Sequence, residues 1–197
     1  MDDDDRGEAG AVLDFWFGAS GSAEYGSARK AWFAKDEGFD AEIHARFGAL
    51  IERALRGELE AWAGAVETAL AQVLLLDQFT RNAYRSTPRS FAGDARALAA
   101  ASRMVGARQD QALPAFKRCF VYLPFEHAES LAMQDEAIRL FTRLVATSPE
   151  LASMLDYAHR HRLVIERFGR FPHRNTILGR RSTAEELAHI ATPGTAF

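Results

Sequence analysis

Hydrophobic and polar residues recur along most of this chain at intervals of three and four, the spacing that gives a helix one apolar face. No run of β-branched residues bounded by turn signals indicates a strand. The pattern therefore predicts helices over residues 9–18, 39–57, 65–84, 92–107, 113–123, 124–148, 149–169 and 183–190. It also predicts a loop over 18–26 and a short turn or helix over 58–64.

Glycine, proline and capping residues mark where several of these helices should begin and end. Gly57 is expected to cap the helix before it, because glycine adopts the left-handed conformation without steric cost. Pro124 is expected to stop one helix and to open the next, and Pro149 is expected to do the same. A capping box, either Ser182–Glu185 or Thr183–Glu186, is expected to open the last helix.

Seven to nine helices with short connections predict an all-α fold of antiparallel helix pairs. We expect residues 10–197 to form a single domain. Residues 1–9 hold five acidic residues and one arginine, a net charge of −4, and are expected to form a disordered acidic tail. Several aromatic residues are expected in the core, among them Trp16, Phe17, Trp32 and Phe33.

The composition narrows the cellular setting. A chain of 197 residues with a net charge of −3 and 48% hydrophobic residues is typical of a globular protein. It has no apolar run long enough to span a membrane and no signal-peptide pattern at its start, so we expect a cytoplasmic protein without a membrane partner. The single cysteine, Cys119, cannot form an internal disulfide bond, which agrees with a reducing compartment.

The segment 157–181 carries much of the candidate chemistry. It contains seven arginines and one acidic residue, Glu166, among apolar residues. This local charge is too small for the wide basic face that nucleic acids usually need, and it suits a small anionic ligand better. A nucleic-acid partner is therefore not expected, whereas a homodimer stays open.

Helical spacing places several polar side chains at the ends of apolar stripes. Asp77 precedes Arg81 by four residues, which is the favourable order for an ion pair within a helix. His161 falls on the apolar face of its helix, whereas His159 points away from it, so the two cannot chelate one metal ion. His127 is expected within a helix as well. No metal site and no cofactor are predicted.

These polar residues have two interpretations. In the structural one, they form ordinary ion pairs, Asp77 with Arg81 and Glu166 with Arg162 or Arg170, and His161 is a hydrogen-bonded core residue. However, the desolvation cost of burying many charges can exceed the free energy that their attraction returns, which favours a shared polar pocket. The expected ligand-binding residues are Asp77, Arg81, Asn82, Arg170, His173, Arg174 and Asn175, and the candidate catalytic residues are Glu126, His127 and His161.

Five stretches of the sequence resemble a bacterial family catalogued as domain of unknown function 924, in the order in which the family has them. They are VLDFWFG, WFAKDEGFDAEI, LLLDQFTRN, YLPFEHAES and HRHRLVIERFGRFPHRNTILGRRST, and together the resemblance covers about residues 11–190. Thr80 and Ala128 depart from the Pro and Ser that the family usually has there. The resemblance implies an all-α domain with the right-handed superhelix of tetratricopeptide-repeat proteins, although the chain shows no clear repeat of about 34 residues. It implies no activity.

Two functions remain open at this point. The first is a binding protein that holds a small anionic ligand or a peptide in a pocket lined by arginine and histidine, since guanidinium groups bind carboxylates and phosphates with two parallel hydrogen bonds. The second is an enzyme that performs acid–base chemistry on an anionic small molecule, with histidine and a carboxylate as the proton carriers. Helical superhelices are mostly scaffolds, which favours the first function.

Overall fold

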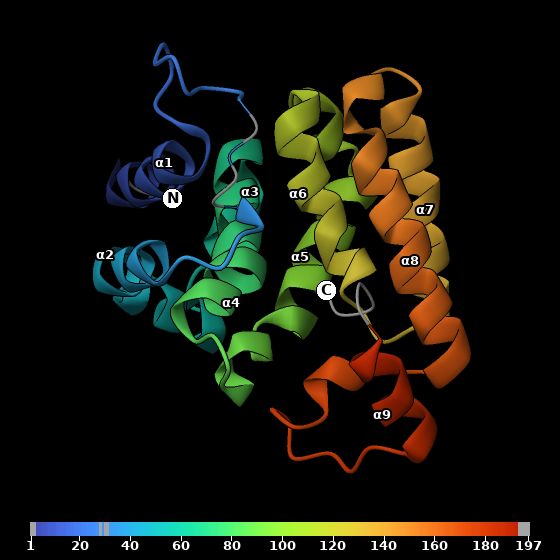
Figure 1. Cartoon of the computed structure of the whole chain (residues 1–197). Coiled ribbons are helices and arrows are strands. Elements are labelled where there is room, and N and C mark those ends of the chain that lie inside the picture. The colour runs from blue at the N-terminus through green and yellow to red at the C-terminus, as the bar shows by residue number, and fades with distance from the viewer. Residues whose placement is uncertain (1–2, 28, 30–31, 193–197) are drawn as a thin grey trace. The chain divides into compact units, whose positions relative to one another are not determined.

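The computed structural model describes residues 3–27, 29 and 32–192, and these residues form helices joined by turns without any strand among them. The predicted all-α class is therefore confirmed (Figure 1). No helix in this described part is both long enough and apolar enough to cross a membrane. The helices are α1 (Asp3–Phe17), α2 (Glu37–Arg56), α3 (Val66–Leu74), α4 (Thr80–Ala83), α5 (Asp94–Gly106), α6 (Ala115–Glu126), α7 (Leu131–Val145), α8 (Ala152–Phe168) and α9 (Ala184–Ala191).

The chain divides into two compact units. The first comprises residues 1–85 and 89–124, and the second comprises residues 86–88 and 125–197. The prediction of a single domain over 10–197 and the prediction of a tetratricopeptide-like superhelix therefore stay predictions.

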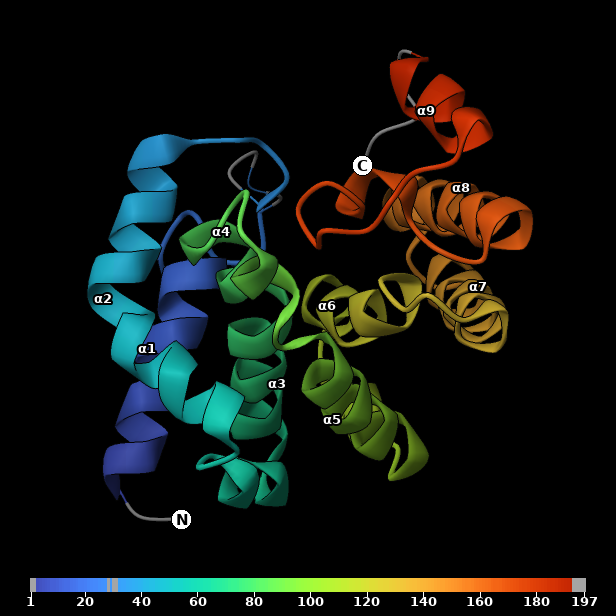
Figure 2. The same cartoon turned by 90° about the horizontal axis from the view of Figure 1, so that it is seen from below.

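The first unit is built around α3. Helices α1 and α5 pack against α3, and α2 packs along α4 (Figure 2). Their shared core is aromatic: the Trp16 ring lies 5.3 Å from the Phe79 ring and 5.8 Å from the Phe120 ring, between centroids. Trp16, Phe17 and Trp32 are buried as expected, but Phe33 is 65% exposed, so its assignment to the core was wrong. Phe33 lies in a turn, where no helical face directs the side chain inward.

Residues 3–9 do not form the expected disordered tail, because they are the first turns of α1. Two acidic residues there have partners far along the sequence: Asp5 Oδ1 accepts a 2.9 Å hydrogen bond from Trp62 Nε1, and Glu8 Oε1 lies 2.7 Å from Arg53 Nη1. Acidic side chains near the N-terminus of a helix are also stabilised by the positive end of the helix dipole. Composition alone does not reveal these tertiary partners. Residues 1–2 lie outside the described part.

One π-helical turn, Leu75–Phe79, joins α3 to α4, so that residues 66–83 run as one helix with a wider turn in the middle. Gly93, directly before α5, lies against this turn. A Cβ atom added at Gly93 would be only 2.1 Å from the Leu76 carbonyl oxygen. The close approach of the two backbones therefore requires glycine at position 93.

The second unit contains the antiparallel pair α7 and α8, which pack side by side through apolar faces (Figure 1). Helix α8 ends at Gly169, which adopts the left-handed conformation with φ 68°. The chain then turns through Pro172–Arg174, and α9 packs against this turn. Phe171, Val164 and Ile165 form a small buried core at this end of α8.

The predicted boundary at Pro124 was wrong. Helix α6 continues past Pro124 to Glu126, and α7 begins only after Ser130. Pro124 cannot donate the usual hydrogen bond to the Phe120 carbonyl oxygen, but the helix continues for two more residues, Phe125 and Glu126, whose side chains are buried. As a result His127 lies in the turn between the two helices and not on a helical face.

Candidate functional site

The ten candidate residues fall in both units. Asp77, Arg81 and Asn82 belong to the first unit, and the remaining seven belong to the second. Within each unit, the contacts separate the residues that stabilise the fold from those that form a candidate site. The prediction that all ten share one pocket stays a prediction.

In the first unit, Asp77 is fully buried in the π-helical turn and forms the predicted pair with Arg81, at 3.1 Å between Oδ1 and Nη1. Arg81 Nη1 also lies 3.0 Å from Asp94 Oδ1 at the start of α5. Burial lowers the pKa of Arg81, but the charges of Asp77 and Asp94 outweigh it and leave that pKa raised. The guanidinium is therefore always charged, and it links the π-helical turn to α5.

Asn82 has a similar linking role. Its amide Nδ2 donates a 2.8 Å hydrogen bond to Asp40 Oδ1 on α2, and Arg85 binds the same carboxylate with two hydrogen bonds of 2.6 and 2.9 Å. Burial raises the pKa of Asp40, but the hydrogen bonds from Arg85 and Asn82 hold it below its usual value. Asn82 therefore holds α4 against α2.

In the second unit, Arg170 and Asn175 fasten the segment after α8 to α9. Arg170 binds Glu186 with two hydrogen bonds of 2.6 and 2.9 Å, and Asn175 Nδ2 reaches the same carboxylate at 3.3 Å. Glu186 also accepts a 2.7 Å hydrogen bond from the Thr183 N–H, which completes the capping box of α9. The hydrogen bond from Arg170, followed by that from Thr183, lowers the pKa of Glu186 to about 2.

Glu129 and Arg180 form a second bidentate pair, which the sequence analysis missed. Arg180 Nη1 lies 2.7 Å from Glu129 Oε2, and Arg180 Nη2 lies 2.9 Å from Oε1. Glu129 also accepts a 2.7 Å hydrogen bond from the Phe171 N–H. Burial raises the pKa of Glu129, but these hydrogen bonds outweigh it, so the pKa is lowered. The pair fixes the turn around Phe171. Its two residues lie 51 positions apart in the sequence, so local spacing does not predict it.

The structural interpretation thus holds for part of the arginine-rich segment. Glu166 was predicted to pair with Arg162 or with Arg170. It pairs with Arg162 at 2.9 Å, whereas Arg170 pairs with Glu186. Of the predicted ligand-binding residues in this unit, Arg170 and Asn175 hold α9 in place. His173 and Arg174 have a different setting.

Arg174 is only 6% exposed, and its contacts include an aromatic ring and a backbone carbonyl group. Its guanidinium carbon lies 4.5 Å from the centroid of the Phe171 ring, which is a cation–π contact. Its Nη2 atom donates a 3.0 Å hydrogen bond to the His127 carbonyl oxygen. The ring of His173 lies 5.7 Å from that of Phe171. Arg174 therefore has a defined position among aromatic side chains.

His161 and Glu126 form a buried pair. His161 Nδ1 lies 2.9 Å from Glu126 Oε1 and 2.9 Å from the Tyr157 carbonyl oxygen, and the two side chains are 8% and 3% exposed. A carbonyl oxygen can only accept, so Nδ1 carries a hydrogen and Nε2 is the nitrogen that can gain or lose a proton. Within the described residues, the buried Glu126 Oε2 has no hydrogen-bond partner.

Two histidines, His161 and His173, lie beside Phe171, and His127 lies beside His161. The His161 ring lies 5.5 Å from the Phe171 ring and 6.2 Å from the His127 ring, between centroids. We call His127, His161, His173 and Arg174 the histidine–arginine cluster. Among the described residues, no group of three His, Cys, Asp or Glu side chains is arranged to hold a metal ion.

The structure therefore defines an all-helical protein whose second unit holds a buried carboxylate–histidine pair with an arginine and two further histidines close by. The chain belongs to the family described as bacterial protein of unknown function (DUF924), whose model matches residues 12–194.

A solved structure has the same fold. It is that of a protein of unknown function from Agrobacterium tumefaciens, to which this chain is 39% identical with a TM-score of 0.80, over 94% of this chain and 97% of the other. Comparison with curated proteins gives no match. The similarity establishes family and fold, and the function has to be argued from the site itself.

Proposed function

We propose that the protein binds a small anionic ligand at the histidine–arginine cluster. The observation that carries the proposal is the position of Arg174, held at 4.5 Å over the Phe171 ring and at 3.0 Å from the His127 carbonyl oxygen. A guanidinium fixed in this way loses little conformational entropy when it binds a carboxylate or a phosphate. The neighbouring imidazoles supply further N–H donors for the same anion.

The burial of the cluster favours a small ligand over a peptide. Arg174 and His161 are each 6% exposed. A peptide needs an accessible surface along which several residues can lie, whereas a small anion needs only a few converging donors. Low exposure also strengthens each charged hydrogen bond, because less water screens it. We therefore assign phosphate, sulfate or a small carboxylate as the ligand chemistry.

A second candidate function rests on the pair of Glu126 and His161. A carboxylate that accepts a hydrogen bond from Nδ1 fixes the ring orientation and stabilises the protonated imidazole, so that Nε2 can act as a general base and then as a general acid. In this proposal the bound anion is a substrate, and His161 exchanges a proton with it. The enzyme proposal requires the anion site, whereas the binding proposal does not require catalysis.

Thermal unfolding in different salts tests the binding proposal. At equal ionic strength, phosphate, sulfate or succinate should raise the melting temperature more than chloride does, because a ligand that binds only the folded state stabilises it. At a hundredfold excess over the Kd, this stabilisation is about 2.7 kcal/mol. Arg174→Ala should remove the anion-specific increment.

Arg167→Ala is the matched control, since it removes the same charge. Arg167 is half exposed at the end of α8 and pairs with Glu185 at 2.8 Å. It should keep the whole increment. If the wild-type protein shows no anion-specific increment, or if both variants lose it equally, the proposed site is wrong.

A further inference from the structure

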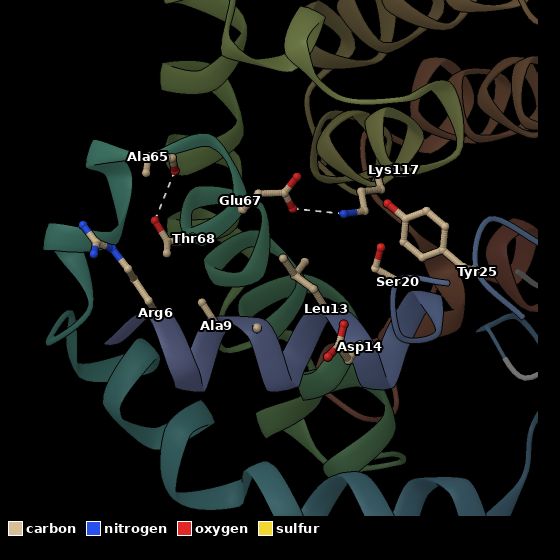
Figure 3. Close-up of a pocket in the computed structure, with 11 residues that line it drawn as sticks. Arg6, Ala9, Leu13, Asp14, Ser20, Tyr25, Ala65, Glu67, Thr68 and Lys117 are labelled. Atoms are coloured by element: carbon tan, nitrogen blue, oxygen red, sulfur yellow. Dashed lines mark hydrogen bonds and ion pairs between the residues drawn. The ribbon is translucent and has the colours of Figure 1, made fainter. Parts of the chain in front are cut away.

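The first unit contains a cavity of about 370 Å³, within the range of about 300–1,000 Å³ that small-molecule sites occupy. Helix α1 forms one wall and the start of α3 forms another (Figure 3). Lys117 and Tyr25 lie at one end of it, and Arg6 lies at the other. None of these residues takes part in the histidine–arginine cluster.

Lys117 is unusually well fixed for a lysine. Its side chain is only 8% exposed, and Nζ lies 3.0 Å from Glu67 Oε2. Nζ also lies 5.6 Å from the ring centroids of both Phe17 and Tyr25, which are cation–π contacts. These aromatic contacts hold the ammonium group at the cavity independently of its ion pair with Glu67.

Glu67 is the replaceable partner of Lys117. Its side chain is 55% exposed, so it can turn into water at little cost in solvation. A ligand carboxylate can then take its place at the Lys117 ammonium group, which has three N–H donors. The nearly buried Lys117 would then have a negatively charged partner in both states, Glu67 without ligand and the ligand carboxylate when it is bound, as a buried charge requires.

Between these ends the cavity is lined partly by small and apolar side chains, and Asp14, Ser20 and Thr68 line it as well. Ala9, Gly10 and Ala65 contribute no side-chain atoms beyond a methyl group, and Leu13 adds an aliphatic side chain. The apolar part of this lining can take up a hydrocarbon chain. We propose that this cavity binds a small linear carboxylic acid, with the carboxylate at Lys117 and the hydrocarbon chain along α1.

The chain offers a variant that blocks the cavity without harming the helix. Gly10 lines the cavity, and a Cβ atom added there would meet nothing within 4 Å. Gly10→Leu should therefore place a large side chain in the cavity while improving the helical propensity of α1. Gly7 lies on the same helix, also has open space at its Cβ position, and does not line the cavity. Gly7→Leu is therefore the matched control.

Titration calorimetry with straight-chain carboxylates from butanoate to decanoate, and with the alcohols of equal length, tests the proposal. We expect saturable binding of a carboxylate of intermediate length, weakened about tenfold or more by Gly10→Leu and unchanged by Gly7→Leu. Lys117→Met should weaken the carboxylate by a similar factor and leave the alcohol unaffected, because Glu67 is exposed enough to remain solvated alone.

Three results would overturn the proposal. The first is the absence of saturable binding for the whole series. The second is unchanged carboxylate binding in Gly10→Leu, which would locate the ligand elsewhere. The third is equal binding of carboxylates and alcohols together with no effect of Lys117→Met, which would show that Lys117 does not recognise the anion.

Discussion

Gly93→Ala tests the packing of the π-helical turn. The added Cβ atom would lie 2.1 Å from the Leu76 carbonyl oxygen, 2.9 Å from its carbonyl carbon and 3.0 Å from its Cα atom. All three are backbone atoms, so no side-chain rotation relieves the contact. To reach the 3.0 Å that real Cβ atoms keep, the two segments must separate by about 0.9 Å.

The cost of that separation can be estimated. Forcing an additional methyl group into a packed interior usually costs about 1–3 kcal/mol, and this site lies at the upper end because both partners are backbone. A loss of about 3 kcal/mol in the free energy of unfolding lowers the melting temperature of a chain of this size by about 6–12 °C.

Denaturant unfolding followed by tryptophan fluorescence is the appropriate assay. Trp16, Trp32 and Trp62 are the three tryptophans of the chain, and all belong to the first unit, as do Gly93 and Leu76. Gly48→Ala is the control: it lies inside α2 with open space at its Cβ position, and it should stabilise the unit by about 0.5–1 kcal/mol. If Gly93→Ala unfolds at the wild-type denaturant concentration, the close approach of the two backbones is refuted.

Three further predictions concern other contacts. Asp5→Ala should destabilise the first unit by about 1–2 kcal/mol, because the buried Trp62 N–H loses its acceptor. Asp4 is exposed, so Asp4→Ala should have no such effect in the same unfolding assay. The pKa of Glu186 is lowered from 4.5 to about 2, so its stabilising contribution should be present above pH 4.5 and lost as the pH falls towards 2. When melting temperature is measured over a pH series, it should therefore fall less steeply with acidification for Glu186→Gln than for the wild type. Long-range ¹H–¹⁵N spectra should show neutral His161 protonated on Nδ1, and protonation on Nε2 alone would contradict the contacts of that ring.

The helices and most of their ends could be predicted because their signals are local. Gly57 adopts the expected left-handed conformation with φ 82°, and Thr183 with Glu186 forms one of the two expected capping boxes. Pro124 misled the prediction because a proline near a helix end either stops the helix or lies within its last turn, and the choice depends on packing. His127 was misplaced for the same reason.

The polar residues show where sequence reasoning ends. The Asp77–Arg81 pair spans one turn of helix and was predicted. Arg170 was assigned to ligand binding, since its partner, Glu186, lies 16 residues further on in α9 and local spacing does not reveal it. Glu126 and His161 were both singled out as catalytic candidates, but their 2.9 Å contact depends on tertiary packing within the second unit. Residue types and local spacing indicate candidates, and only tertiary structure decides which of them meet.

An experimental structure of the protein crystallised with saturating phosphate or a small dicarboxylate would show directly whether the histidine–arginine cluster binds an anion. We expect an anion within hydrogen-bond distance of the Arg174 guanidinium and of at least one imidazole of the histidine–arginine cluster. An anion bound only at other arginines, or no anion at Arg174 under saturating conditions, would contradict it.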